Sequence, residues 1–179
     1  IVLAVMVSAL GHISGAHVNP AVTIGLLVGG KIKGGRAVGY IISQLAGGVI
    51  AGLLLRAIYS TEVWAKVNLG TPGLGAGVGA GTGILVEIIL TFFLVFAVYG
   101  TAVDEKAPKI GGFGIGLVLV FDILMGGPLT GASMNPARTF GPAVVSGYWD
   151  AHWVYWVGPI LGGILAAVLY RLCTGGDSS

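Results

Sequence analysis

Four long apolar segments dominate the pattern of hydrophobic and polar positions along this chain of 179 residues, and they cover residues 36–56, 83–100, 111–127 and 153–170. A helix needs ~20 mostly apolar residues to cross a bilayer. Apart from Arg36 and Arg56, which bound the first segment, only two charged side chains lie inside these segments, Glu87 in the second and Asp122 in the third. The pattern therefore predicts an all-α membrane protein with these four segments as transmembrane helices.

Two shorter apolar segments, 21–28 and 137–145, each follow an Asn-Pro pair, Asn19-Pro20 and Asn135-Pro136. Asparagine is a favoured N-cap, and proline is favoured at the first helical position because its missing N–H would have no partner there. Eight or nine helical residues reach only ~13 Å, less than half of a ~30 Å hydrocarbon core. We therefore expect two re-entrant half-helices that meet by their N-termini and together span the membrane.

These half-helices belong to a motif that occurs twice, at 14–23 and 130–140, with Ser/Thr-Gly-Ala, Asn-Pro-Ala and a following Thr in register. The repeat divides the single channel domain, 1–179, into the remainder of a first repeat, a connecting loop and a second repeat, at 1–58, 59–82 and 83–179. Glu87 lies 48 residues before Asn135, and the matching position before Asn19 would fall ahead of Ile1. We therefore expect the first helix and most of the second to be absent from this chain, with 1–10 as the end of a helix.

Composition agrees with a membrane protein: 55% of the residues are hydrophobic, 9% are charged, and the mean hydropathy is +0.96. The net charge of +2 does not indicate a nucleic-acid partner, and a single cysteine excludes an internal disulfide. The Gly-rich stretch 70–83 reads as a loop and lacks the Lys-Ser/Thr ending of a phosphate-binding loop. We find no nucleophile–base pair, metal-ligand cluster or nucleotide motif, so neither an enzyme nor a cofactor is expected.

Basic residues predict the orientation. If each half-helix returns to the side from which it entered, one side of the membrane carries Lys31, Lys33, Arg36, Lys106, Lys109 and Arg171. This side should be cytoplasmic, because cytoplasmic loops are enriched in Lys and Arg. A group of aromatic residues is compatible both with an interfacial belt and with ordinary packing: Trp149, Trp153, Tyr155 and Trp156.

The paired stretches 17–22 and 134–143 resemble the two pore motifs of the aquaporin (major intrinsic protein) family, and 154–159 and Glu87…Thr91-Phe92 resemble two of its helices. The resemblance covers essentially the whole chain, with archaeal-like features at 100–109 and plant vacuolar-membrane-like features at 126–134. It implies a right-handed bundle of six helices and two half-helices, assembled as a homotetramer with one pore per subunit. It also implies a passive water channel that excludes protons and ions, with ammonia or another small neutral solute as a further permeant, in the plasma membrane rather than the vacuolar one.

The pore residues implied by this resemblance are Asn19, Pro20, Ala21, Asn135, Pro136 and Ala137. We expect the two asparagine amides to face the pore and to donate hydrogen bonds to the oxygen of a passing water. The positive field of two helix N-termini would oppose hydronium and other cations there, whereas neutral water would pass. The selectivity filter is assigned to Ile123, Ala132 and Arg138, with a fourth position ahead of Ile1. The positions that follow the water-channel pattern rather than the glycerol-facilitator pattern are Thr139, Ala143, Tyr155 and Trp156.

Three further residues are open to more than one interpretation. Glu87 could relay protons, but the resemblance favours a structural carboxylate that accepts hydrogen bonds from backbone N–H groups of the half-helix loop. His17 is expected to orient its loop rather than to bind metal, and His12 is expected in a turn. For Asp122, an ion pair with Arg138 and a hydrogen bond between helices both remain open.

Alternative functions are a glycerol or small-solute facilitator of the same family and a structural or junctional membrane protein with little flux. A secondary transporter with broken helices would need a site for the coupling ion, and only Glu87 and Asp122 are available for one.

Overall fold

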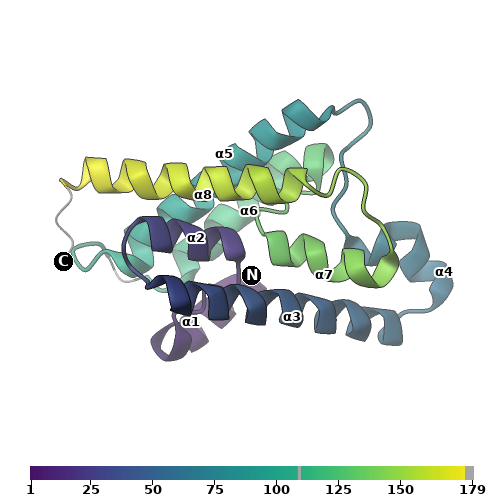
Figure 1. Cartoon of the computed structure of the whole chain (residues 1–179), viewed down its shortest axis with the longest axis horizontal. Helices are drawn as coiled ribbons and strands as arrows, with labels where there is room; N and C mark the ends of the chain where they lie inside the picture. The colour runs from purple at the N-terminus through teal and green to yellow at the C-terminus, as the bar shows by residue number, and fades with distance from the viewer. Residues whose placement is uncertain (109, 176–179) are drawn as a thin grey trace.

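The computed structural model describes residues 1–108 and 110–175, and the regular structure within them is helical (Figure 1). In chain order the elements are α1 (Val2–Ser14), α2 (Pro20–Val28), α3 (Gly34–Ile58), α4 (Thr61–Trp64), the 3-10 helix η1 (Ala65–Gly70), α5 (Ala80–Val98), the π-helical turn η2 (Tyr99–Val103), α6 (Gly112–Thr130), α7 (Pro136–Ser146) and α8 (Val154–Cys173).

The four predicted spans are confirmed as α3, α5 with η2, α6 and α8, which within the described residues are long and apolar enough to cross a membrane. The chain is thus a multi-pass membrane protein. Two expectations were wrong in detail. His12 lies in the last turn of α1 rather than in a turn between elements, and the connecting loop contains the short helices α4 and η1.

The half-helices α2 and α7 begin at the two Asn-Pro pairs. The Asn19 side chain accepts a hydrogen bond from the Ala21 N–H, 2.8 Å away, and the Asn135 side chain accepts from Ala137 at 3.0 Å and from Arg138 at 3.2 Å. These bonds satisfy N–H groups that the first helical turn otherwise leaves without a partner. Figure 1 shows α2 and α7 in line between the long helices α3 and α8.

Glycines in α3 and α8 allow the half-helices α7 and α2 to approach them closely. A Cβ atom on Gly48 of α3 would stand 2.6 Å from the Ala137 carbonyl oxygen in α7, and one on Gly163 of α8 would stand 2.7 Å from the Ala21 oxygen in α2. Ala21 and Ala137 hold the same position in the two repeats. Each half-helix therefore packs closely against one long helix, α7 against α3 and α2 against α8.

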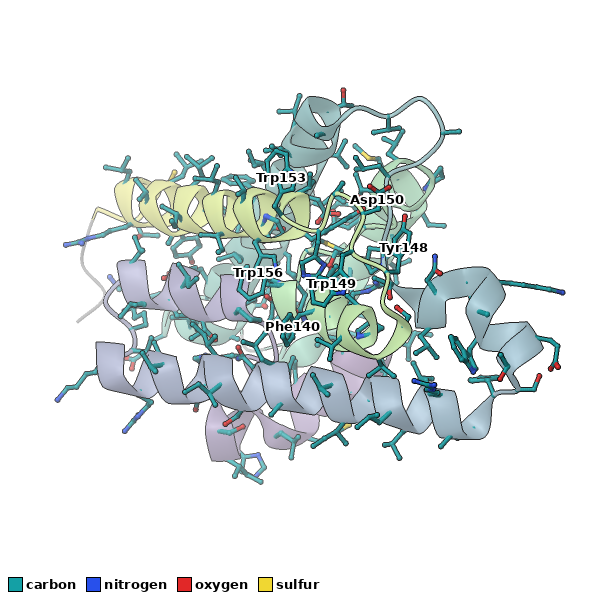
Figure 2. All side chains as sticks on the ribbon, turned by 45° about the vertical axis from the view of Figure 1, so that its right-hand side comes forward. Phe140, Tyr148, Trp149, Asp150, Trp153 and Trp156 are labelled. Atoms are coloured by element: carbon teal, nitrogen blue, oxygen red, sulfur yellow. The ribbon has the colours of Figure 1, made fainter. Side chains whose placement is uncertain are left out.

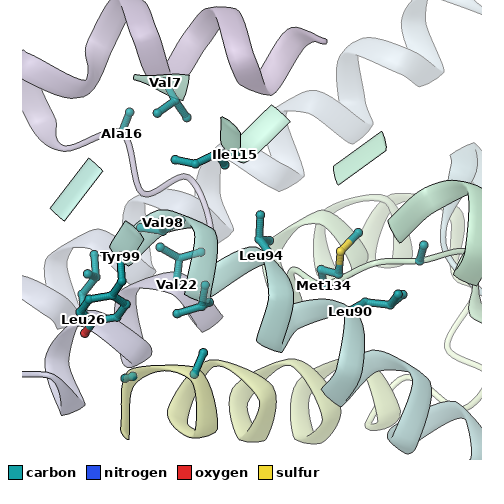
Figure 3. Close-up of a cluster of buried hydrophobic side chains, with 14 of the residues drawn as sticks. Val7, Ala16, Val22, Leu26, Leu90, Leu94, Val98, Tyr99, Ile115 and Met134 are labelled. Carbon is teal, nitrogen blue, oxygen red and sulfur yellow. The ribbon is translucent and has the colours of Figure 1, made fainter. Parts of the chain in front are cut away.

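The hydrophobic core lies between α1, α2, α5, α6 and α8 and includes the two loops that precede the half-helices (Figure 3). Its fully or nearly fully buried members include Val22, Leu90, Leu94, Val95, Met134 and Ala166. Helix α3 differs from the other spans, because only 6% of the residues in its 18-residue apolar stretch are buried within the protein. Its outer surface presents large apolar side chains such as Ile42, Ile50 and Leu54.

Two of the basic residues that the orientation argument assigns to one side of the membrane lie close together. Lys31, after α2, and Arg171, in the last turn of α8, line the same small pocket with Tyr99 and Tyr170. Figure 1 shows the turn between α2 and α3 at the same end of the molecule as the C-terminal end of α8. Lys109 lies outside the described residues.

The close contact at Gly48 leads to a first prediction. Gly48→Ala places a methyl group against the Ala137 carbonyl and should lower the free energy of unfolding by ~1–3 kcal/mol. The matched control is Gly47→Ala, because a Cβ at Gly47 meets nothing within 4 Å. This change should be neutral or stabilise by up to roughly 1 kcal/mol, as alanine favours the helix over glycine. Thermal unfolding of both purified variants tests this, and equal stability of the two would contradict the packing model.

Candidate pore site

The loops before the two half-helices share an unusual backbone conformation. Ala16 and Ala132 have φ values of 44° and 46°, and Val18 and Met134 have values of 43° and 53°. This left-handed region disfavours non-glycine residues by roughly 1–2 kcal/mol each, and a β-branched valine more than most. The same conformation at matching positions in both repeats shows that the two loops are built alike and that the surrounding structure holds them in place.

The two asparagines join the loops reciprocally. Asn19 donates through Nδ2 to the Met134 carbonyl oxygen at 2.8 Å, and Asn135 donates through Nδ2 to the Val18 oxygen at 3.0 Å. Because each Oδ1 already accepts from its own helix, both amides are fixed in orientation. An asparagine NH2 group carries two N–H donors, and these contacts use one of them. The second N–H of each amide is available to a molecule in the adjoining cavity.

Both asparagines line a cavity of about 740 Å³. The three filter residues that the sequence assigned, Ile123, Ala132 and Arg138, line it as well. They come from α6, from the second loop and from α7, so the structure brings together residues that lie up to fifteen positions apart. A second cavity of about 1100 Å³ runs along α3, and Asn135 and Arg138 line both cavities.

Arg138 reaches from the first turn of α7 to the chain that connects α3 with α5. Its Nη1 atom donates to the Gly70 carbonyl oxygen at 3.2 Å, and its side chain is exposed to the cavities. Sequence reasoning missed Gly70, because a backbone carbonyl leaves no mark in the side-chain pattern.

Neither interpretation of Asp122 is supported. Its side chain is completely buried in α6, and among the described residues neither carboxylate oxygen has a hydrogen-bond partner. Of the two possibilities that the sequence left open, an ion pair with Arg138 and a hydrogen bond between helices, neither is present within the described part of the chain.

The Glu87 carboxylate holds the second loop from behind. Its Oε1 accepts from the Ser133 N–H at 2.9 Å and from the Thr130 hydroxyl at 2.7 Å, and its Oε2 accepts from the Met134 N–H at 2.7 Å. Glu87 is fully buried. Two backbone donors of a loop within the membrane thus find an acceptor that lipid could not supply. Thr130 and Ser133 were not identified from the sequence, although both lie in the repeated motif.

The first loop is held differently. The His17 ring stacks on Tyr40 of α3, with centroids 4.5 Å apart and planes 18° from parallel, and its Nδ1 lies 3.2 Å from the Thr23 hydroxyl. Gln44, also in α3, donates to the same hydroxyl at 2.9 Å. His17 is therefore placed to orient its loop. Within the described residues, no three His, Cys, Asp or Glu side chains are grouped so that they could hold a metal ion.

The four positions that follow the water-channel pattern line neither cavity. Thr139, Ala143 and Tyr155 are fully buried, and the Tyr155 hydroxyl donates to the Thr130 carbonyl at 2.8 Å. Thr139 shares a short hydrogen bond with the Ser133 hydroxyl. Thr139 and Tyr155 therefore contact the second loop from the side away from the cavities, and an effect of these two residues on permeation would act through the shape of that loop.

The aromatic residues between α7 and α8 divide between the two interpretations. Trp149 and Trp153 are 47% and 53% exposed, as an interfacial belt requires, whereas Tyr155 is fully buried and belongs to the packing. Figure 2 shows the labelled aromatic side chains gathered where α7 meets the beginning of α8.

His152 lies within this aromatic group. The Trp156 indole Nε1–H donates to His152 Nε2 at 3.0 Å, and the Trp149 ring makes an edge contact with the imidazole at 4.7 Å between centroids. Because an indole N–H can only donate, His152 Nε2 must be unprotonated in this contact. Burial lowers the pKa of His152 below its ordinary value of 6.5.

Two capped half-helices that meet inside a bundle of membrane-spanning helices, beside a cavity lined by fixed polar groups, define a membrane channel. Comparison with known proteins identifies its family. The family model for the major intrinsic proteins matches residues 1–170, and the chain therefore belongs to the major intrinsic protein, or aquaporin, family. Members of this family are channels and not enzymes.

Curated relatives agree. The chain is 52% identical over 173 residues to aquaporin TIP4-4 of Zea mays, covering 95% of this chain and 67% of that protein. It is 49% identical over 168 residues to the probable aquaporin TIP3-2 of Arabidopsis thaliana, covering 92% and 61%. The chain thus spans about two thirds of the length of the relatives it matches. The aquaglyceroporin of Plasmodium falciparum has the same fold, with a TM-score of 0.80 at 23% identity over 93% of this chain and 77% of that one.

The contacts of Glu87 lead to a second prediction. Glu87→Leu leaves the N–H groups of Ser133 and Met134 and the Thr130 hydroxyl without their acceptor, at about 1–3 kcal/mol for each unpaired group. Glu87→Gln is the matched control, because its amide oxygen still accepts and should preserve most of the stability. Thermal unfolding in detergent compares the two. Equal stability of the Leu and Gln variants would show that the loop does not depend on the carboxylate.

The position of His152 leads to a third. An unfolded chain binds a proton here near pH 6.5, whereas the folded protein does so only at lower pH. The folded state therefore loses stability as the pH falls below ~6.5, until the lowered pKa is passed. We expect the unfolding midpoint to drop between pH 7.5 and 5, and to drop less in His152→Gln, whose amide oxygen can accept from Trp156 without titrating. The other two histidines are common to both proteins. An unchanged pH dependence in the variant would refute the assignment.

Proposed function

We propose that this protein forms a passive transmembrane pore for water. One observation carries the proposal: the amides of Asn19 and Asn135 are held by both half-helices and by each other's loops, and both line one cavity. Each keeps one N–H donor for a permeating molecule. A water oxygen with two lone pairs matches two such donors.

The geometry also accounts for the exclusion of protons and cations. A water that accepts from both asparagines has its oxygen fully engaged, so its hydrogens point along the pore toward its neighbours. Two helix N-termini place roughly half a positive charge each at the same point. Hydronium would lose solvation and meet this field, whereas neutral water avoids both penalties. The fixed charge of Arg138 opposes cations in the same way.

The filter residues favour water, with a second small solute as a further permeant. Ile123 provides an apolar wall at the position where strictly water-selective members of the family have His. Ala132, the next filter position, has a small side chain. The aperture that they form with Arg138 is then wider than a single file of water needs, which favours ammonia as an additional permeant. Water is also favoured over glycerol by four positions that match the water-channel pattern of the family: Thr139, Ala143, Tyr155 and Trp156.

Further proposals concern the whole protein. We propose that residues 1–58 are the remainder of a first repeat, 59–82 a connecting loop and 83–179 a second repeat, and that the protein is a homotetramer with one pore per subunit. The relatives are TIP-type aquaporins, whose name refers to the vacuolar membrane of plants. This favours the vacuolar membrane over the plasma membrane that we expected from the sequence.

The alternatives have less support. The Glu87 carboxylate accepts three hydrogen bonds, which leaves it poorly placed to bind a coupling ion, and this argues against a secondary transporter. A glycerol facilitator has no specific residue in its favour. A purely structural membrane protein would not need the two oriented amides.

A fourth prediction tests the function. Proteoliposomes containing the full-length protein should show fast water flux and slow or negligible glycerol flux in stopped-flow light scattering, without proton flux under an imposed gradient. Arg138→Val should remain folded and should admit glycerol or other small solutes, because it removes both the charge and the bulk at the filter. Glycerol flux comparable to that of a known glycerol facilitator would overturn the assignment. An Arg138→Val variant that folds and conducts as the parent does would show that Arg138 is not part of the filter.

A further inference from the structure

The connection between α3 and α5 contains a tightly held turn, and its residues Leu69 and Gly70 line the second cavity beside Arg138. Asn68, Leu69 and Gly70 are three consecutive residues with left-handed backbone, at φ values of 48°, 55° and 73°. Two of them are not glycine, so this conformation is intrinsically disfavoured. It is nevertheless well packed, since Leu69 is only 4% exposed. The surrounding structure must therefore hold the turn in place.

The turn points the Gly70 carbonyl group toward the Arg138 guanidinium. The Gly70 oxygen accepts from the Arg138 guanidinium at 3.2 Å, which is the contact that fixes the direction of this side chain. Farther along, the same connection meets the end of α6, because the Gly75 N–H donates to the Leu129 oxygen at 2.8 Å. The turn is thus attached to α7 on one side and to α6 on the other, and both helices border the filter.

One side chain fastens the turn, that of Thr71. Its N–H and its hydroxyl both donate to the Asn68 carbonyl oxygen, at 3.0 Å and 2.6 Å. Its hydroxyl oxygen also lies 3.3 Å from the Ser146 hydroxyl, at the last residue of α7. Ser146 in turn accepts from the Tyr148 N–H at 3.2 Å.

The donors and acceptors of this chain fit only one direction. Because the single hydroxyl proton of Thr71 is used toward Asn68, the Thr71 oxygen must accept from the Ser146 hydroxyl, whose own oxygen accepts from Tyr148. The bonds therefore run from the Tyr148 N–H through Ser146 and Thr71 to the Asn68 carbonyl. The turn is tied to the C-terminal end of α7 by Thr71 and to its N-terminal turn by Arg138.

We infer that Thr71 is a positioning residue for permeant selection: its hydroxyl fixes the turn at 68–71, and the turn fixes the Arg138 guanidinium through the Gly70 carbonyl. The inference rests on the proposed function, in which Arg138 borders the filter. The width of the constriction between Ile123, Ala132 and Arg138 depends on where the guanidinium lies. A guanidinium released from Gly70 occupies a wider range of positions and leaves more room for larger solutes.

The test measures the ratio of glycerol to water permeability in proteoliposomes containing the full chain. Thr71→Val keeps the shape of the side chain but removes its hydroxyl, and it should raise the ratio by about two- to tenfold, the effect of losing a typical hydrogen bond. Thr71→Ser retains the hydroxyl and should restore the parent ratio. The matched control is Thr174→Val, which removes a similar hydroxyl-to-carbonyl bond of 2.9 Å, to Tyr170, at the C-terminal end of α8. It should leave the ratio unchanged.

A double variant shows whether the effect passes through Arg138. In an Arg138→Val background, Thr71→Val should produce no further change in the ratio, because no guanidinium remains to be positioned. If the ratio shifts there by the same factor as in the parent, Thr71 acts by another route and the inference is wrong. A Thr71→Val variant that reduces water and glycerol flux in proportion would also overturn it.

A substitute variant and a comparison with the parent protein cover the remaining outcomes. If Thr71→Val does not fold, Ser146→Ala breaks the same chain of hydrogen bonds from the α7 side and should raise the ratio in the same direction, whereas an unchanged ratio in this variant refutes the inference. The failure of the proposed function is recognised separately, because the parent protein itself would then conduct no water. A parent that conducts water, with an Arg138→Val variant that is altered and a Thr71→Val variant that is not, rejects the positioning role alone.

Discussion

The reciprocal hydrogen bonds between Asn19 and Met134 and between Asn135 and Val18 are the interaction on which the rest of this structure depends. Two helix ends and two irregular loops meet between membrane-spanning helices, where neither lipid nor an extended water phase can satisfy backbone groups. Each asparagine satisfies backbone groups in two ways. Its Oδ1 accepts from N–H groups of its own half-helix, and its Nδ2 donates to a carbonyl of the opposite loop. The same contacts that make the junction stable orient the two amides toward the cavity.

The two repeats satisfy the remaining loop groups by different means. In the second, the Glu87 carboxylate accepts from two backbone N–H groups and one hydroxyl. In the first, His17, Tyr40 and Gln44 surround the loop and the Thr23 hydroxyl. Both loops nevertheless have the same left-handed residues at matching positions, so equal backbone geometry is reached through unequal side chains. Close packing at Gly48 and Gly163 then fixes α7 against α3 and α2 against α8.

Arg138, which we propose as a filter residue, finds its hydrogen-bond partner in a part of the chain that lies far from both motifs. Arg138 is placed in the first turn of α7 by the Asn135 cap, but the direction of its guanidinium is set by the Gly70 carbonyl. The connection between α3 and α5 is therefore more than a linker, because a disfavoured backbone turn is maintained there by Thr71 and by packing around Leu69.

The sequence by itself determined the elements and their main signals. Long, mostly apolar segments specify membrane-spanning helices, and an Asn-Pro pair followed by eight or nine mostly apolar residues specifies a short capped helix, because both depend on local composition and spacing. The filter residues Ile123, Ala132 and Arg138 were assigned from the resemblance, and the structure places them around one cavity.

Only the tertiary structure decided which groups meet. The carbonyls of Val18, Met134 and Gly70 leave no trace in a side-chain pattern, so neither the cross-connection of the loops nor the partner of Arg138 could be foreseen. The burial of Tyr155 and the exposure of Trp149 and Trp153 depend on how α7 and α8 pack, and three aromatic residues so close in sequence look alike before that packing is known. Asp122 illustrates the same limit, because its burial without a hydrogen-bond partner among residues 1–108 and 110–175 follows from the helices that surround it and not from its neighbours in the chain.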